Sequence, residues 1–156
     1  METTKKTKEF TVNEVTTTYK PAFKSSERPK ILNPNDLYEL ILKYEPMQEI
    51  LNYKEMFVAV YVNQNSTVLS IQRIGEGGLT ATSVDIRIIM QSALLQCATG
   101  IFLLHNHPSR HLRPSQADIN LTKKVKQAAE FFDIKILDHL IISDESYYSM
   151  FEHDQF

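Results

Sequence analysis

The chain has 156 residues, of which 42% are hydrophobic and 23% charged, the size and mixture of one ordinary globular domain. A formal net charge of -2 excludes an overall positive field of the kind that holds nucleic acid, although it leaves room for local basic patches. No apolar run approaches the roughly 20 residues that a membrane-spanning helix needs, and no apolar stretch follows the charged N-terminus, so we expect a cytoplasmic location.

Residues 1–30 differ in composition from the rest of the chain. They are rich in Lys, Thr, Ser and Glu and poor in apolar side chains, which predicts a flexible N-terminal tail ahead of one domain over residues 31–156. Asn35 or Asp36 can cap a first helix, and Pro46 is expected to end or kink it. The apolar positions that share one face of this helix are Leu37, Leu40, Ile41 and Tyr44.

Residues 55–62 predict a central strand, because β-branched and aromatic side chains occupy both of its faces. Residues 67–74 are expected to form its hairpin partner after a short polar turn. Glycines at positions 75, 77 and 78 indicate that a loop follows this hairpin.

A second helix is expected to begin at its cap, Ser83, and to run to about Ala98, with Gly100 as its C-terminal stop. It contains Cys97, the only cysteine, which excludes a disulfide framework and a cysteine-based zinc site. The apolar pattern around Cys97 predicts a buried core thiol.

The second half of the chain alternates strands and helices. Ser115 can cap a helix over residues 116 to about 132, and strands are expected at 101–104, 134–142 and 147–151. This alternation predicts an α/β fold with a mixed sheet and helices on both faces.

Two histidines leave the buried strand at 101–104 together. His105 and His107 are two residues apart, so in extended chain their side chains point the same way and can meet on one metal ion. Asp118 lies in the first turn of the next predicted helix, and the proline-rich loop between can fold it back toward the histidines. Two imidazole nitrogens and one carboxylate oxygen suit zinc, and three protein ligands leave the fourth position for water.

A hydrolytic centre of this kind also needs a group that moves protons. Zinc lowers the pKa of a bound water to about 7, and a nearby carboxylate can then shuttle the proton. Glu55 is the candidate, because it opens the central strand beside residues 101–104. The hydroxyl of Ser115 can donate to a developing oxyanion.

At this point the sequence resembles a known family. Glu55, followed by His105-x-His107-x7-Ser115-x2-Asp118, matches the JAMM (MPN+) metalloprotease motif in every element. The strings HNHPS, PSxxD, TKKV, ILDHLIIS and YYSMFE are similar to the RadC family, a bacterial branch of that fold, and the resemblance covers about residues 31–154.

The resemblance implies a three-layer α/β/α domain (JAB/MPN) similar to cytidine deaminases. It also implies zinc on His105, His107 and Asp118, Glu55 as general acid and base, and Ser115 as oxyanion helper. JAMM relatives hydrolyse peptide or isopeptide bonds, whereas RadC proteins carry a DNA-repair label. The sequence departs from the RadC pattern at Arg110, where a glycine usually follows HNHPS, and residues 1–30 lack the glycine-based signature of the helix-hairpin-helix region that precedes the RadC domain.

Each of these residues also has a purely structural interpretation. Ser115 and Asp118 form S-x-x-D, a helix-capping pattern, and Glu55 can be a solvated residue at a strand edge. Asp138 and His139 are adjacent within an apolar strand, so they lie on opposite faces and are expected to have hydrogen-bonded structural roles rather than to bind one ion.

Three functions therefore compete. The first is a zinc-dependent hydrolase that acts on a peptide or protein substrate. The second is a DNA-repair or DNA-processing protein that uses the same metal, as the RadC label suggests; the net charge and the missing helix-hairpin-helix region count against it. A basic cluster at Arg110, Arg113, Lys123, Lys124 and Lys126 could meet an anionic partner, although such a cluster is usually a solvated helix face. The third is a binding module without turnover.

Overall fold

Five strands form one mixed sheet within residues 16, 18–77 and 83–156, the part of the chain that the computed structural model describes. β3 and β4 run parallel, and the other neighbouring pairs are antiparallel. The spatial order is β2-β1-β3-β4-β5, which places β1 and β3 well inside the sheet. In chain order the strands are β1 (Met56–Val62), β2 (Val68–Glu76), β3 (Gly100–Asn106), β4 (Lys135–Ile142) and β5 (Tyr147–Ser149).

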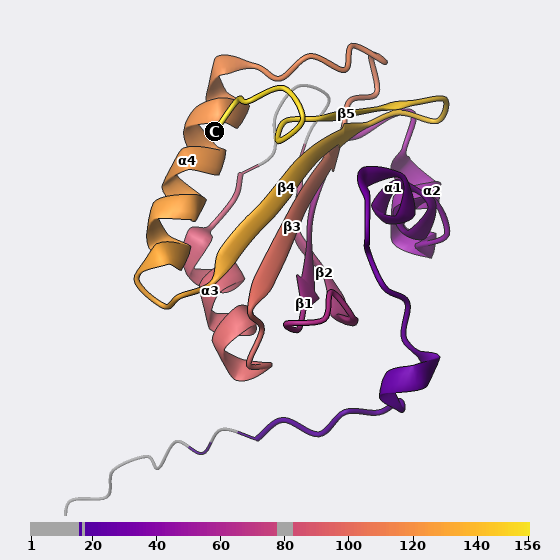
Figure 1. Cartoon of the computed structure of the whole chain (residues 1–156). Helices are drawn as coiled ribbons and strands as arrows, with labels where there is room; N and C mark the ends of the chain where they lie inside the picture. The colour runs from indigo at the N-terminus through magenta and orange to yellow at the C-terminus, as the bar shows by residue number, and fades with distance from the viewer. Residues whose placement is uncertain (1–15, 17, 78–82) are drawn as a thin grey trace, which may run out of the picture.

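Helices cover both faces of this sheet (Figure 1). α1 (Pro34–Leu42) and α2 (Glu45–Ile50) lie on one face, and α3 (Ile86–Leu95) and α4 (Gln116–Glu130) lie on the other. A short 3-10 helix, η1 (Ser25–Glu27), precedes them. The predicted α/β class with three layers is therefore confirmed.

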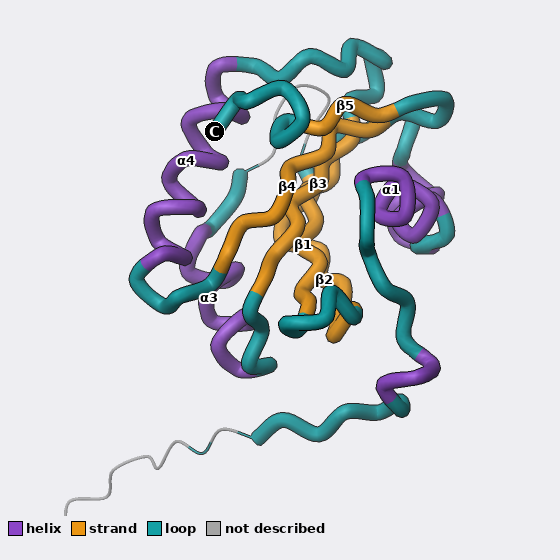
Figure 2. Tube along the Cα trace, in the orientation of Figure 1, coloured by secondary structure: helices purple, strands orange, loops and turns teal. Residues whose placement is uncertain are grey.

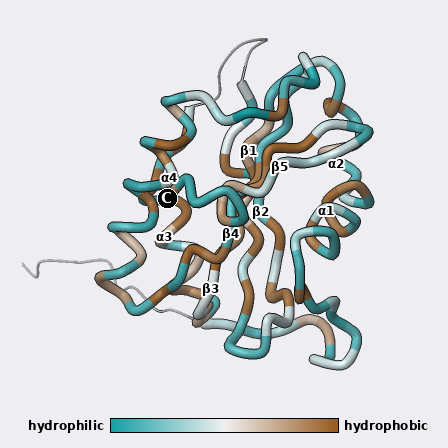
Figure 3. The backbone as a smooth tube through the Cα atoms, turned by 45° about the horizontal axis from the view of Figure 1, so that its top comes forward, coloured by the Kyte–Doolittle hydropathy of each residue, from teal (hydrophilic) through white to brown (hydrophobic). Residues whose placement is uncertain are grey.

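The apolar residues of β1 explain its central position. All seven of its residues are buried, and alternate side chains enter two different apolar clusters. Val58 and Val60 pack in the cluster that includes α1 and α2, whereas Ala59 and Tyr61 pack with α3 and α4. The hydropathy colouring shows apolar residues running along the strands between polar outer faces of the helices (Figure 3). A strand buried on both faces needs no polar alternation.

The first helix has its N-cap two residues before Asn35, the earlier of the two predicted caps. Asn33 is the N-cap of α1: its side chain accepts a hydrogen bond from the backbone N–H of Asp36, and the Asp36 carboxylate accepts one in return. Pro46 comes after the end of α1, as expected, but it also lies in the first turn of α2, where its missing N–H costs nothing.

The prediction of a buried thiol at Cys97 was also wrong. α3 begins after its cap, Asp85, and ends at Leu95, so Cys97 lies beyond the helix. Cys97 takes a left-handed backbone conformation (φ 55) that reverses the chain, and the residue is exposed. Ala98 then donates its N–H to the carbonyl of Ala93, which closes the helix end. Gly100, predicted as the helix stop, is the first residue of β3.

The N-terminal segment is described only in part. Residues 1–15 and 17 lie outside the described residues, so the predicted tail stays a prediction. Within the described part, Lys30 pairs with Thr67, and Pro29 accepts a hydrogen bond from Val68 at the start of β2. Of the predicted glycine loop, Gly75 belongs to β2 and Gly78 lies outside the described residues. No helix among the described residues is both long and apolar enough to cross a membrane.

Gly100 allows a close approach between β3 and β4, and replacing it tests this packing. A Cβ at position 100 would lie 2.6 Å from Leu137 Cδ1 and 3.0 Å from Val62 Cγ2. We expect Gly100→Ala to lower the free energy of unfolding by about 1–3 kcal/mol in urea denaturation, as overpacking does. The same substitution in a Leu137→Ala background should cost clearly less; an equal cost in both backgrounds would contradict the steric explanation.

Candidate metal centre

The C-terminal end of β3 supplies the two histidines. His105 is the next-to-last residue of β3 and is 4% exposed, and His107 follows the strand by one residue. β3 pairs antiparallel with β1, and His105 lies opposite Phe57. The start of β1 is therefore next to the C-terminal end of β3. The loop after His107 then passes over this end of the sheet to α4 (Figure 2). Asp118 lies in the first turn of that helix.

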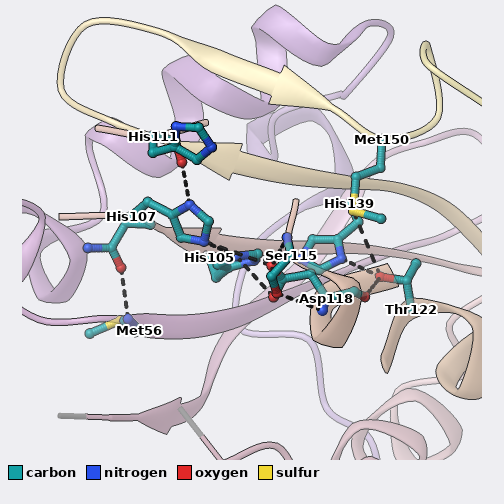
Figure 4. Close-up of polar contacts among 10 residues, drawn as sticks. Met56, His105, His107, His111, Ser115, Asp118, Thr122, His139 and Met150 are labelled. Carbon is teal, nitrogen blue, oxygen red and sulfur yellow. Dashed lines mark hydrogen bonds and ion pairs between the residues drawn. The ribbon is translucent and has the colours of Figure 1, made fainter. Parts of the chain in front are cut away.

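The side chains of these three residues converge (Figure 4). His105 Nε2 lies 2.9 Å from His107 Nε2 and 3.4 Å from Asp118 Oδ1, and His107 Nε2 lies 3.9 Å from Asp118 Oδ2. Ligands held at about 2.0–2.2 Å from a tetrahedral ion are about 3.3–3.6 Å from one another. The three separations bracket this range, so the three groups could hold one metal ion.

The protonation of His107 supports the same conclusion. His107 Nδ1 lies 2.5 Å from the backbone carbonyl oxygen of His111. A carbonyl can only accept, so Nδ1 carries a proton, and the Nε2 atom is the one left to bind a metal ion. His107 Nε2 faces His105 and Asp118, where it could coordinate a cation.

Burial keeps His105 neutral. Burial lowers its pKa to about 4, against the opposing effect of the Asp118 carboxylate, and the neighbouring His107 lowers the pKa further. A neutral imidazole is the form that binds a metal ion.

Ser115 orients the third group. Its hydroxyl and its backbone N–H donate to Asp118 Oδ2, over 2.6 Å and 2.7 Å, and its oxygen accepts from the N–H of Asp118 at 3.2 Å. This is a capping box at the start of α4, and it leaves Oδ1 facing His105. The structural interpretation of Ser115 is thus realised, and its oxyanion role stays a prediction.

Glu55 lines the same cavity as the two histidines and Asp118. The cavity has a volume of about 560 Å³, and apolar side chains at Phe57, Val84 and Leu121 form part of its wall. Burial raises the pKa of Glu55; the Asp118 carboxylate adds to this, and His107 opposes it. A carboxylate with a raised pKa beside a candidate metal-binding cluster is suited to accept and release protons.

The loop over the site is tied by Arg110 to the turn between β4 and β5. Arg110, which departs from the RadC pattern, takes the left-handed backbone conformation (φ 60) that a glycine favours. Its guanidinium pairs with Asp144 at 2.7 Å and with Glu145 at 3.6 Å. His111 is exposed at the side chain, and it reaches the site through its carbonyl oxygen and by lining the cavity.

Sequence reasoning missed the role of Asn106. This side chain is 0% exposed, accepts from the N–H of Met56 at 2.8 Å, and donates to the carbonyls of Leu51 and Lys54 at 2.8 and 2.7 Å. It therefore joins the histidine-bearing end of β3 to the segment on either side of Glu55. A lone polar residue at the end of an apolar strand is the only sequence signal for such a role.

Asp138 and His139 have the hydrogen-bonded roles that were expected. Asp138 accepts from the Ser149 hydroxyl at 2.6 Å and from the N–H of Phe151 at 3.0 Å. His139 contacts the candidate metal-binding cluster, which the sequence did not predict: its Nε2 lies 2.8 Å from His105 Nδ1. The contact arises from the parallel pairing of β3 with β4. His139 lies opposite Leu103 in this pairing and therefore shares a sheet face with His105.

Asn106 provides a test of how the two halves of the site are held together. Asn106→Leu removes three hydrogen bonds and leaves their backbone partners buried, so we expect a loss of about 2–4 kcal/mol in the free energy of unfolding. Asn120→Leu, on the exposed face of α4, is the matched control and should change it by less than about 0.5 kcal/mol. Equal effects of the two substitutions in urea denaturation would show that Asn106 does not hold the site together.

Comparison with known proteins identifies the family. A family model described as RadC-like JAB domain matches residues 31–155. The UPF0758 protein of Flavobacterium johnsoniae is 40% identical over 127 residues, which cover 81% of this chain and 54% of that protein. The UPF0758 protein of Porphyromonas gingivalis is 37% identical over 127 residues, with 81% and 56% covered, and that of Streptococcus gordonii is 42% identical over 105 residues, with 66% and 46% covered. The chain thus spans about half the length of these curated relatives, and it belongs to the RadC-like JAB domain family.

Proposed function

We propose that this domain is a zinc-dependent hydrolase of the JAMM type that cleaves a peptide or isopeptide bond. The observation that carries the proposal is the convergence of His105 Nε2, His107 Nε2 and Asp118 Oδ1 in a cavity that Glu55 also lines. Two imidazole nitrogens with one carboxylate oxygen are a donor set typical of catalytic zinc. When bound there, zinc supplies Lewis-acid chemistry, polarising a carbonyl and acidifying water.

The residues around the cluster then have distinct tasks. Glu55 takes a proton from the attacking water and delivers it to the leaving amine, for which its raised pKa suits it. Ser115 holds the Asp118 carboxylate through two hydrogen bonds and lies on the cavity wall, from which its hydroxyl can turn toward a developing oxyanion. The apolar wall at Phe57, Val84 and Leu121 offers contact to an apolar side chain of the substrate.

Cleavage of DNA at the same centre is the second candidate. Arg113 lines the cavity, and Lys123 and Lys124 are exposed on α4, which gives an anionic substrate some basic groups to meet. The protein's net charge of -2 offers an anionic substrate no general electrostatic attraction. Peptide or isopeptide hydrolysis is therefore preferred, and the two are separated by experiment.

Zinc content tests the centre itself. We expect the purified full chain, dialysed against dilute zinc, to retain about one zinc per chain, as a three-ligand site does. His107→Ala should lose most of it, because it removes one of three converging ligands. His153→Ala, which removes a histidine that stacks on Tyr148 outside the cavity, is the matched control and should retain zinc. Equal zinc in both variants, measured by mass spectrometry of the metal, would contradict the assignment.

Turnover is tested with Glu55→Gln, which keeps the shape of the side chain and removes its capacity to accept a proton. We expect zinc-loaded wild type to cleave members of peptide or isopeptide-linked pools, and Glu55→Gln to be slower by about 100- to 10,000-fold with its zinc retained. Glu76→Gln is the matched control: Glu76 is exposed at the end of β2, and its loss should leave the rate unchanged.

Single- and double-stranded DNA are assayed beside the peptides. Cleavage of DNA that depends on Glu55 would replace the peptidase proposal with the nuclease alternative. Equal behaviour of wild type and Glu55→Gln on every substrate would favour a binding module that does not turn over.

A further inference from the structure

A chain of hydrogen bonds runs from the buried side of His105 back to α4 (Figure 4). His105 Nδ1 lies 2.8 Å from His139 Nε2, and His139 Nδ1 lies 2.6 Å from Thr122 Oγ1. Thr122 Oγ1 lies 2.7 Å from the backbone carbonyl oxygen of Asp118. The side chains of His139 and Thr122 are 0% exposed, so water does not compete for these bonds.

The positions of the protons follow from the ends of this chain. Two oxygen atoms 2.7 Å apart require a proton between them, and the Asp118 carbonyl has none, so the Thr122 hydroxyl donates there. The hydroxyl has no second proton, and Thr122 Oγ1 must therefore accept from Nδ1 of His139. A buried histidine is neutral and has one ring proton, which leaves Nε2 of His139 as an acceptor.

The last link concerns His105. His139 Nε2 accepts, so the proton between the two rings belongs to Nδ1 of His105. A neutral His105 then has a bare lone pair at Nε2, the atom that faces His107 and Asp118. The opposite tautomer of His105 would carry its proton on Nε2, and that nitrogen could then not bind a cation.

We propose that His139 and Thr122 are positioning residues that fix His105 as its Nδ1-protonated tautomer, with Nε2 ready to bind the metal ion. The role of the pair rests on the metal centre of the proposed function. Thr122 lies four residues after Asp118 on the same face of α4. The chain of hydrogen bonds from Asp118 through Thr122 and His139 to His105, called the relay below, therefore links the backbone of one metal-binding residue to the ring of another. Phe57 stacks on the ring of His105 and meets that of His139 edge-on, which holds both rings in the orientation that the relay needs.

The tautomer can be measured directly in the metal-free protein. Long-range nitrogen NMR of the full chain with labelled histidine distinguishes the two ring nitrogens, and we expect His105 and His139 both to carry their proton at Nδ1. Thr122→Val removes the hydroxyl at nearly constant volume and should disturb this pattern at both rings. Thr122→Ser restores the hydroxyl and should restore the pattern. Thr67→Val is the matched control, since Thr67 is also buried but lies just before β2, far along the chain from Thr122.

Zinc affinity is the second measurement, made by competition with a metal-binding dye. Loss of a group that orients a metal-binding histidine weakens binding by about 10- to 100-fold, which is the shift expected for Thr122→Val. Thr122→Ser and Thr67→Val should bind as wild type does. A general loss of packing would not be rescued by serine in this way.

The possible results separate this proposal from the proposed zinc centre. His105 protonated at Nε2 in the wild type, or a Thr122→Val variant with unchanged tautomers and unchanged zinc affinity, would overturn the relay while leaving the zinc centre standing. A wild type that has the expected tautomers but binds no zinc would leave the relay as a structural device and remove the proposed centre.

Discussion

The site depends on two imidazole nitrogens that face each other across a short distance. His105 Nε2 and His107 Nε2 are 2.9 Å apart, and the other nitrogen of each ring is already engaged with a hydrogen-bond partner. Two ring nitrogens at this distance need a proton or a metal ion between them, and the Asp118 carboxylate adds negative charge at the same place. The surrounding structure is arranged to keep these three groups together: the strand fixes the histidines, the capping box fixes the carboxylate, and Asn106 fixes the approach of Glu55.

Much of this arrangement could be predicted from the sequence because it is local. Residues two apart in a strand share a face, and S-x-x-D before an apolar-periodic segment begins a helix, so both patterns are determined within a few residues. The strands β1, β3 and β4 were predicted to within about two residues, since each is an apolar run between polar turns. The resemblance to the RadC and JAMM families supplied the roles, which the residue pattern alone leaves open.

The features that the sequence did not reveal depend on contacts between distant segments. His139 reaches His105 only through the register of two parallel strands, and Asn106 reaches Leu51 and Lys54 from more than 50 residues further along the chain. Cys97 was expected to be buried because its neighbours are apolar, but a left-handed backbone turn ends the helix before it. Local apolar periodicity gives the face of a helix and does not give the residue at which tertiary packing ends it.

The most direct test of the account is a crystal structure of the chain grown with zinc, with diffraction measured on both sides of the zinc absorption edge. The account predicts one anomalous peak about 2.0–2.2 Å from His105 Nε2, His107 Nε2 and Asp118 Oδ1, within the cavity that Glu55 lines. Imidazoles and carboxylate that turn away from one another, with the zinc bound elsewhere or nowhere, would contradict it.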